Sequence, residues 1–324
     1  MHKTTLLAAG MLALVLSAAA ARADEADCTP KLLSVQPLIA EPDGRYAVEV
    51  AINGAPHRLL LATSTVRTMF FQDFAQSAGM RQHEMPEHKF IFGFGGKGVG
   101  YAVADSVSIA GNTASGVQAL LINSGYDADT QVVGTLGADL LSNFDLDIDF
   151  KADKLSLYAS NPCDGKPVYW ASRYADLAFS GAEGFAVPMT LDGKTLDVSL
   201  DTLVPHSEMR MDVANEYFGL TESSPGLVQT GTSREHRPIY RYTFGTLAAD
   251  GVSISKPVIA LQGYSEGEHC NGKRHSGAGP VQGMVRFHIC HNEGELDLGM
   301  QDLRPTHMYI AYKARRVYLT VASN

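Results

Sequence analysis

Hydrophobic and polar positions alternate along two stretches of the chain, and each stretch ends at a tight-turn dipeptide. Residues 46–52 read YAVEVAI and lead into Asn53-Gly54, and residues 185–191 read FAVPMTL and lead into Asp192-Gly193. Period-two alternation is typical of a strand with one buried face, and Asn-Gly or Asp-Gly after such a run favours a two-residue hairpin. The strand after each turn has a buried apolar run, RLLLA in one case and VSLD in the other.

The remaining pattern is also mainly β, with short helices. The segments DIDFKADKLSLY (147–158) and YIAYKARRVYLT (309–320) predict two further hairpins. The segments FFQDFAQSAGM (70–80) and RMDVANEYFGL (210–220) predict short helices, each ending near a glycine that suits a C-cap. We therefore expect an all-β fold with short helices.

The same blocks occur twice, in the same order. After the two turns, Gly79-Met80 corresponds to Gly219-Leu220, one residue out of step. GVQAL (116–120) then matches PVIAL (257–261), and residues 136–158 match residues 298–320 without a gap. Collinear repetition of four blocks indicates a duplicated domain. We expect two tandem lobes, residues 24–160 and 182–324, joined by a linker at 161–181 that contains Pro and Gly.

Composition and the N-terminus predict an exported protein. The 324 residues are 45% hydrophobic, which is ordinary for a globular chain, and the formal net charge of −9 without a Lys/Arg block argues against a nucleic-acid ligand. Residues 1–23 have the features of a signal peptide: a positive start, an apolar stretch from Leu6 to Leu16, and Ala21-Arg22-Ala23 as a cleavage site. An uncleaved anchor is the alternative. We expect no membrane span after cleavage, and a location in a bacterial periplasm or outside the cell.

Four cysteines follow the signal peptide: Cys28, Cys163, Cys270 and Cys290. An even number in an oxidising compartment favours disulfides. The pairs Cys28–Cys163 and Cys270–Cys290 are each local to one lobe, and we prefer them for that reason.

The second lobe carries an insertion, residues 262–292, that has no counterpart in the first lobe. It contains two of the cysteines and four histidines, which are His269, His275, His288 and His291. Zinc is the alternative to a disulfide here, but the spacing matches no strong zinc pattern, so we expect no metal and no cofactor.

The candidate functional residues lie in the turn that follows the first hairpin of each repeat. Eight residues after Gly54 the chain reads ATS (62–64), and eight after Gly193 it reads DTL (201–203). The strands, the turns and the order in which they follow one another resemble those of the aspartic protease superfamily. The resemblance is in particular to two-lobed retropepsin-like bacterial proteins, whose turn reads Asp-Thr-Gly. Asp201, Thr202 and Thr63 match that motif, whereas Ala62 replaces Asp, and Ser64 and Leu203 replace Gly.

The resemblance implies two retropepsin-like lobes that face each other across a cleft. The hydrophobic-Gly segments that pass behind the turns would be TLG (135–137) and DLG (297–299), and FGFGG (92–96) resembles the family's flap, with Phe94, Gly95 and Gly96 as peptide-binding residues. A weaker flap counterpart is QTGTS (229–233). The resemblance also implies that the hydroxyls of Thr63 and Thr202 hydrogen-bond across the lobe junction; the alternative is that each is a β-former ending a strand.

Peptide hydrolysis in this family needs two carboxylates that share a proton, one acting as base and the other as acid. Asp201 is the only motif aspartate, and Ala62 has no proton to give. We therefore expect a catalytically impaired pseudoprotease that binds an extended peptide or protein. The alternatives are an active aspartic endopeptidase, using an unrecognised carboxylate or a homodimer, and a structural or metal-binding envelope protein. The oligomeric state stays open.

Two further groups have simpler interpretations. Asp145, Asp147 and Asp149 alternate along one strand and predict an exposed acidic face rather than a calcium site. His206 follows Asp201 by five residues and is expected to be a turn or surface histidine.

Overall fold

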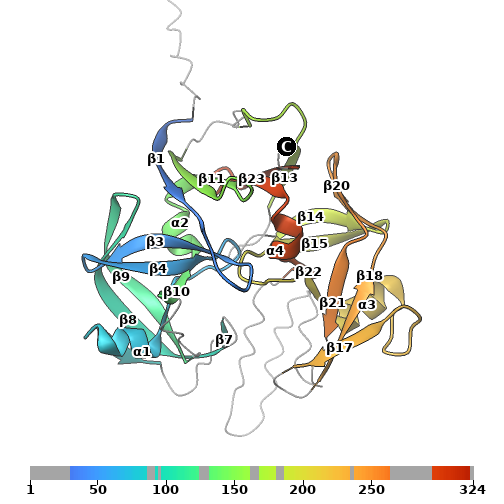
Figure 1. Cartoon of the computed structure of the whole chain (residues 1–324), viewed down its shortest axis with the longest axis horizontal. Helices are drawn as coiled ribbons and strands as arrows, with labels where there is room; N and C mark the ends of the chain where they lie inside the picture. The colour runs from blue at the N-terminus through green and yellow to red at the C-terminus, as the bar shows by residue number, and fades with distance from the viewer. Residues whose placement is uncertain are drawn as a thin grey trace, which may run out of the picture.

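The computed structural model describes residues 30–85, 92–93, 96–123, 131–160, 168–179, 186–233, 237–262 and 294–321. The prediction of a mainly β chain is confirmed: these residues form three sheets and four short helices. Two lobes lie side by side, and the third sheet lies between and above them in the view of Figure 1. Within the described part of the chain, no helix has both the length and the apolar character needed to cross a bilayer.

The first lobe is built on a sheet that closes on itself. Strand β3 pairs with β4 on one side and with β8 on the other, so β3, β4, β10, β5, β9 and β8 form a six-stranded barrel of mixed direction. The strands of this sheet are β2 (Ile39–Ala40), β3 (Tyr46–Ile52), β4 (Ala55–Leu61), β5 (Met69–Phe71), β6 (Arg81–Glu84), β7 (Phe92–Gly93), β8 (Gly96–Ile109), β9 (Asn112–Asn123) and β10 (Val132–Leu136).

The second lobe repeats this strand order. The sequence β14-β15-β22-β16-β21-β18 corresponds to β3-β4-β10-β5-β9-β8 of the first lobe. The counterpart of the long β8 is divided into β18 and β19, and the counterpart of β9 is divided into β20 and β21. Pro257 lies between β20 and β21 and has no N–H to donate to a strand ladder. The strands are β14 (Ala186–Leu191), β15 (Lys194–Leu200), β16 (Glu208–Arg210), β17 (Val228–Thr232), β18 (Pro238–Thr243), β19 (Thr246–Ala249), β20 (Val252–Ser255), β21 (Val258–Gln262) and β22 (Leu296–Leu298).

Both predicted turns are two-residue hairpins. Ile52 pairs with Ala55 across Asn53-Gly54, and Leu191 pairs with Lys194 across Asp192-Gly193. The φ angles are 50° and 83° in the first turn and 45° and 82° in the second. Positive φ at both central positions is the geometry that Asn-Gly and Asp-Gly tolerate best, which is why the dipeptides predicted the turns correctly.

The helices of the described residues are α1 (Gln72–Ser77), α2 (Ala138–Leu141), α3 (Met211–Phe218) and α4 (Met300–Leu303). Two of these four helices, α1 and α3, lie where the sequence predicts them, whereas α2 and α4 were not predicted. Helix α3 ends at Gly219, which adopts φ 67° at the C-cap. In the first lobe the C-cap is Ala78, and Gly79 follows it with φ 63°. The extra residue of the second copy therefore lies at the end of α3.

One block of the sequence alignment is wrong by a residue. The sequence match of GVQAL with PVIAL places Leu120 opposite Leu261. In the structure the N–H of Leu120 donates to Thr68 O at 3.0 Å, and the equivalent bond in the second lobe joins Ala260 to Ser207 at 2.8 Å. Leu120 thus corresponds to Ala260, which lines the cavity described below.

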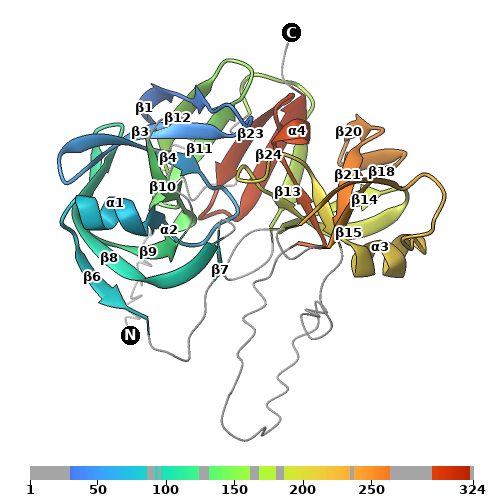
Figure 2. The same cartoon turned by 60° about the horizontal axis from the view of Figure 1, so that its bottom comes forward.

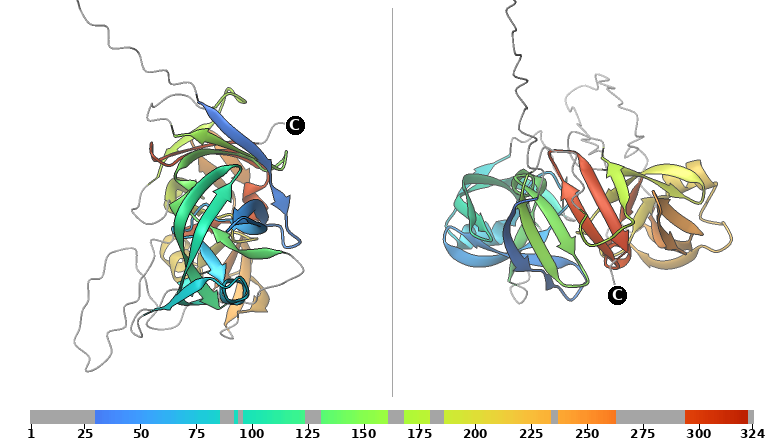
Figure 3. Two further views of the ribbon diagram at one scale, coloured as in Figure 1. Left: turned by 90° about the vertical axis from the view of Figure 1, so that its left-hand side faces the viewer. Right: turned by 90° about the horizontal axis from the view of Figure 1, so that it is seen from above.

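The six-stranded sheet takes strands from both lobes (Figures 2 and 3). Its order is β1 (Leu32–Pro37), β12 (Lys154–Ala159), β11 (Phe144–Asp149), β23 (Thr306–Ala311), β24 (Arg316–Val321) and β13 (Ala175–Ala178). Strands β11–β12 and β23–β24 are the predicted terminal hairpins. Strand β13 lies within the segment 161–181, which we expected to be only a linker; this part of it pairs with β24 instead.

The expectation of an exposed acidic face on β11 is wrong. Asp145 and Asp147 are only 2% and 0% exposed. Asp147 contacts Nε2 of His307 and accepts a hydrogen bond from the hydroxyl of Tyr169 at 2.8 Å, while Tyr309 donates to Asp145 at 3.3 Å. The sequence of β11 alone hides this arrangement, because His307 and Tyr309 come from β23 of the other lobe.

Trp170 covers this acidic cluster from the outer side. Its indole stacks on His307 with ring centroids 3.8 Å apart, and Nε1 donates to the hydroxyl of Thr320 at 2.8 Å. Burial, and then the neighbouring carboxylates, raise the pKa of Tyr169 and of Tyr309, so both phenols stay protonated and act as donors. Part of the predicted linker is therefore held against the sheet that joins the lobes.

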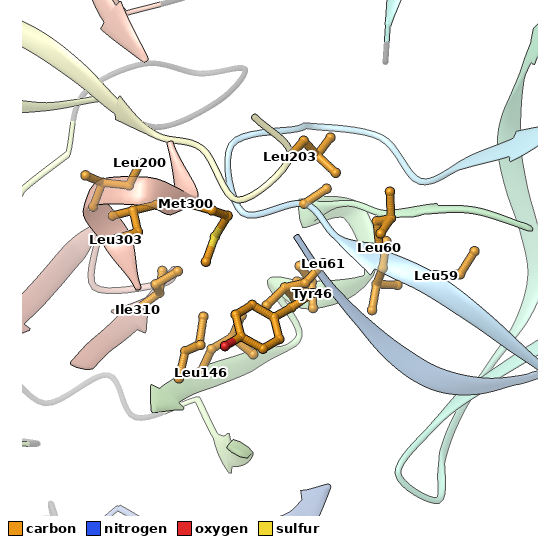
Figure 4. Packing of buried hydrophobic residues seen from close by; sticks show 14 of the residues in the cluster. Tyr46, Leu59, Leu60, Leu61, Leu146, Leu200, Leu203, Met300, Leu303 and Ile310 are labelled. Atoms are coloured by element: carbon orange, nitrogen blue, oxygen red, sulfur yellow. The ribbon is translucent and has the colours of Figure 1, made fainter. Parts of the chain in front are cut away.

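A single apolar core runs through both lobes. Figure 4 shows Leu61 and Leu146 of the first lobe near Leu200, Met300 and Ile310 of the second, where the two halves meet. All five side chains are at most 1% exposed. Because this core is shared, the relative position of the two turns described below is fixed by packing as well as by hydrogen bonds.

We expect Asp147→Ala to lower the free energy of unfolding by about 3–5 kcal/mol, because it leaves the buried His307 without its partner. Urea unfolding at pH 7 measures this effect. Asp105→Asn, at an exposed position of β8, is the matched control and should change stability by less than about 0.5 kcal/mol. Equal stability of the two variants would show that the buried cluster does not hold the lobes together.

Candidate functional site

The two turns occupy equivalent places in the two lobes. Ala62 follows β4, and its N–H donates to Leu136 O at 3.1 Å; Asp201 follows β15, and its N–H donates to Leu298 O at 3.0 Å. In each lobe the strand that accepts this bond, β10 or β22, runs parallel to the strand before the turn. The structure therefore places Ala62 of the first lobe at the position that Asp201 occupies in the second.

Two buried threonines join the turns reciprocally. The hydroxyl of Thr63 donates to Leu200 O at 2.6 Å, and the hydroxyl of Thr202 donates to Leu61 O. The oxygen of Thr202 also accepts from the N–H of Thr63 at 3.1 Å. Both threonines are completely buried, so an unsatisfied hydroxyl or amide would be costly here. These are the cross-junction bonds that the resemblance implied, and they account for a threonine in each turn.

Asp201 is partly exposed, whereas Leu203 and Ala62 are buried. The N–H of Leu203 donates to Oδ1 of Asp201 at 2.7 Å. Leu203 is 8% exposed and Ala62 is fully buried. Leucine therefore fits the turn as a packed side chain, and the methyl group of Ala62 supplies neither a donor nor an acceptor at the equivalent position.

Behind each turn lies a second hydroxyl that the sequence reasoning missed. Thr68 and Ser207 each lie six residues beyond Ala62 or Asp201, and their oxygens accept from Gly137 N at 3.1 Å and Gly299 N at 3.0 Å. A Cβ on Gly137 would lie 2.4 Å from the carbonyl carbon of Arg67, so only glycine fits there. The same spacing in both copies of the repeat was the signal that could have revealed this pair.

Each of these hydroxyls donates to a carboxyl, that of the partly buried Asp139 or that of the buried Asp302. Thr68 donates to Asp139 at 2.7 Å, and Ser207 donates to Asp302 at 2.5 Å. The two acids differ by one position in the alignment, since Asp139 corresponds to Gln301. Burial raises the pKa of Asp139 and of Asp302, although the hydrogen bonds from the hydroxyls oppose the shift.

A cavity of about 320 Å³ opens beside the Asp201 turn. Its wall includes the loop after Leu203, the hairpin formed by β17 and β18, and the ends of β16 and β21. The weaker flap counterpart, QTGTS, contributes Thr230 and Gly231 of β17 to this wall. A cavity of this size is within the range that holds small ligands or a side chain.

His206 has the role of a surface histidine, as expected. It is exposed, borders the cavity, and its Nδ1 lies 2.9 Å from Oε1 of Gln301. Among the described residues, no group of three or more His, Cys, Asp and Glu side chains is placed to hold a metal ion.

Several predicted residues lie outside the described part of the chain. These are the signal peptide, the four cysteines Cys28, Cys163, Cys270 and Cys290, the flap residues Phe94 and Gly95, and the histidines of the insertion. Gly96 is the first residue of β8, and Gly93 pairs with it.

Comparison with known proteins adds no assignment: neither a family model nor a curated protein matches this chain.

We expect Thr63→Val and Thr202→Val each to lower the free energy of unfolding by about 1–3 kcal/mol, because each leaves buried backbone groups unpaired. Valine keeps the shape and the β-propensity of threonine, so a threonine that merely ended a strand would lose little. The double variant should be non-additive by more than about 0.5 kcal/mol in a double-mutant cycle. Thr195→Val, at an exposed position of β15, is the control, and values equal to that control contradict the prediction.

The raised pKa of Asp302 gives stability a defined pH dependence. A carboxyl whose folded pKa lies above its unfolded value stabilises the fold fully below the unfolded pKa, and this contribution is lost as the pH rises through the folded pKa. Asp302→Asn removes the titration, so its stability should fall less than that of the wild type between pH 4 and pH 7. Urea unfolding across that range measures the slope, with Asp105→Asn as control; parallel curves for all three proteins would refute the assignment.

Proposed function

We propose that this chain is an exported pseudoprotease of the aspartic-protease type. Its two retropepsin-like lobes face each other across a cleft, hold an extended peptide or protein segment there, and do not cut it. The observation that supports this proposal is that Ala62 and Asp201 occupy equivalent positions in the two turns. The periplasm of a bacterium or the extracellular space is the proposed location.

The chemistry of peptide hydrolysis supports the proposal that this site does not cut its ligand. Water must lose a proton to one group while the peptide carbonyl oxygen receives one from another, and a lone carboxyl cannot do both in one step. General acid–base catalysis contributes about 10²–10⁴-fold to rate, so a missing partner has a large effect. The reciprocal threonine bonds keep the turns together without that partner, which is what a binding scaffold requires.

The second lobe supports peptide binding. Strand β17 is an edge strand of its sheet, and all five of its residues are exposed. An exposed edge can pair with an extended peptide through backbone hydrogen bonds, while a neighbouring pocket takes a side chain. The cavity beside β17 lies next to the loop after Asp201, so one extended segment can reach both.

The test combines binding and cleavage on the same purified protein, with the residues from 24 onward. A pool of capped, fluorescent nonapeptides and unfolded casein are incubated with it from pH 3 to pH 7, beside Asp201→Asn. We expect the peptides to be bound and recovered intact, and casein to stay uncut, with both proteins. Cleavage that is lost in Asp201→Asn would establish an active aspartic endopeptidase and overturn the proposal.

A blocking variant locates the binding. A Cβ on Gly231 meets no atom within 4 Å, so Gly231→Trp should fold and place its indole against the cavity. We expect peptide affinity to fall by about tenfold or more, as when a central contact is lost. Thr195→Trp, on an exposed position of the same lobe, is the control. Unchanged affinity in Gly231→Trp would place the binding site elsewhere.

A further inference from the structure

Three neighbouring strands of the second lobe place a carboxylate, a methyl group and a guanidinium in one row. Glu208 of β16 pairs with Ala260 of β21, and Ala260 pairs with Arg241 of β18. Residues directly opposite each other on neighbouring strands share a face of the sheet. All three residues line the cavity of about 320 Å³ beside the Asp201 turn. The row therefore presents one acidic and one basic group to the same cavity, with a small side chain between them.

The first lobe has the same row without charge. There Met69 of β5 pairs with Leu120 of β9, and Leu120 pairs with Tyr101 of β8. A leucine thus occupies the place of Ala260, and the two outer places hold a thioether and a phenol. The second lobe differs at all three positions, because its central residue is smaller and each outer residue carries a charge.

The two charged groups do not neutralise each other directly. Among the described residues, no ion pair joins Glu208 to Arg241, and Arg241 is exposed. Glu208 is partly exposed and accepts a hydrogen bond from the side-chain amide of Gln262 at 3.2 Å. A carboxylate has about four lone-pair positions, so Glu208 can accept a bond from a ligand in addition to its bonds within the protein.

Most of the remaining cavity wall is apolar. Val204, Pro205 and Ile239 contribute aliphatic groups to it. His206 is exposed, and its Nδ1 lies 2.9 Å from Oε1 of Gln301. Such a wall suits a side chain that has an aliphatic stem and a single polar end group.

The opposite charges of the row decide which end group fits. A cationic end group is attracted by Glu208 and repelled by Arg241, and an anionic end group meets the reverse. A carboxamide avoids both repulsions, because its oxygen accepts from a guanidinium while its NH₂ group donates to a carboxylate. The outer strands of the row are about 10 Å apart, so the two long side chains can contact one carboxamide from opposite sides, over the methyl group of Ala260.

We propose that this cavity selects a carboxamide side chain, glutamine or asparagine, from the extended peptide. The inference rests on the proposed function, because it names the side chain that the same cleft accepts. The carboxamide lies between Glu208 and Arg241, and the aliphatic stem packs against Ile239 and Pro205. Both hydrogen bonds of the carboxamide are made to charged groups, and such bonds are stronger than those between neutral groups.

The test uses four pools of capped, fluorescent nonapeptides with glutamine, leucine, lysine or glutamate fixed at the central position. The other positions are randomised over glycine, alanine, serine and threonine, so that only the fixed residue supplies a charge, a carboxamide or a large apolar group. Fluorescence anisotropy measures their affinity for the protein from residue 24 onward. We expect the glutamine pool to bind about tenfold more tightly than each of the other three.

Two variants should change this preference in opposite directions. Arg241→Glu gives the row two carboxylates, so the lysine pool should become the tightest binder; the position is exposed, so the variant should fold. Glu208→Gln leaves Arg241 as the only charge of the row, so the glutamate pool should become the tightest. The matched control is Lys194→Glu, which reverses a charge at an exposed position of β15 outside the cavity wall and should keep the glutamine preference.

Equal binding of the four pools to wild type, or tightest binding of any pool other than glutamine, overturns this inference and leaves the proposed function standing. A glutamine preference that persists in Arg241→Glu also overturns it, because the carboxamide would then bind elsewhere. This variant decides the question even if Glu208→Gln folds poorly. Binding of no pool overturns the proposed function itself.

Discussion

The structure depends on one reciprocal interaction: the hydroxyl of each turn threonine donates to a carbonyl of the opposite lobe. Because both groups are buried, neither can be satisfied by water, and the two turns must meet in one geometry. That geometry brings Ala62 and Asp201 to equivalent places at the junction. Under the proposed function, a methyl group then stands where a second carboxyl would share a proton with Asp201.

A second constraint acts on the outer side of the molecule. The six-stranded sheet joins strands of both lobes, and its central pair, β11 and β23, buries Asp147 against His307. Trp170 stacks on that histidine and closes the cluster. Loss of a buried acid of this kind is destabilising, because it leaves buried polar groups without partners. The lobes are thus fixed relative to each other at the turns, through the shared core, and at the sheet.

Much of the fold could be predicted from local sequence, and the reasons are physical. Asn53-Gly54 and Asp192-Gly193 specify hairpins because few other residues tolerate their φ angles. The duplication predicted equivalent turns, and the threonine in each. The burial of Asp147 could not be predicted, since its partners come from β23 and from the supposed linker. The place of Ala260 in the cavity wall was missed for another reason: the sequence alignment matched Leu120 with Leu261, and the register that pairs Ala260 with Glu208 appears only in the paired strands.

Under the proposed function, the chain has the scaffold of a two-acid site with a single acid in it, so that it binds a peptide without hydrolysing it. The most direct measurement is a ¹³C NMR titration of the Asp201 carboxyl in the protein from residue 24 onward, with Asp201→Asn used to assign its resonance. The account predicts that this resonance follows a one-proton curve, as an aspartate without a coupled acid does. Two coupled steps in the same resonance, typical of carboxyls that share a proton, would contradict it.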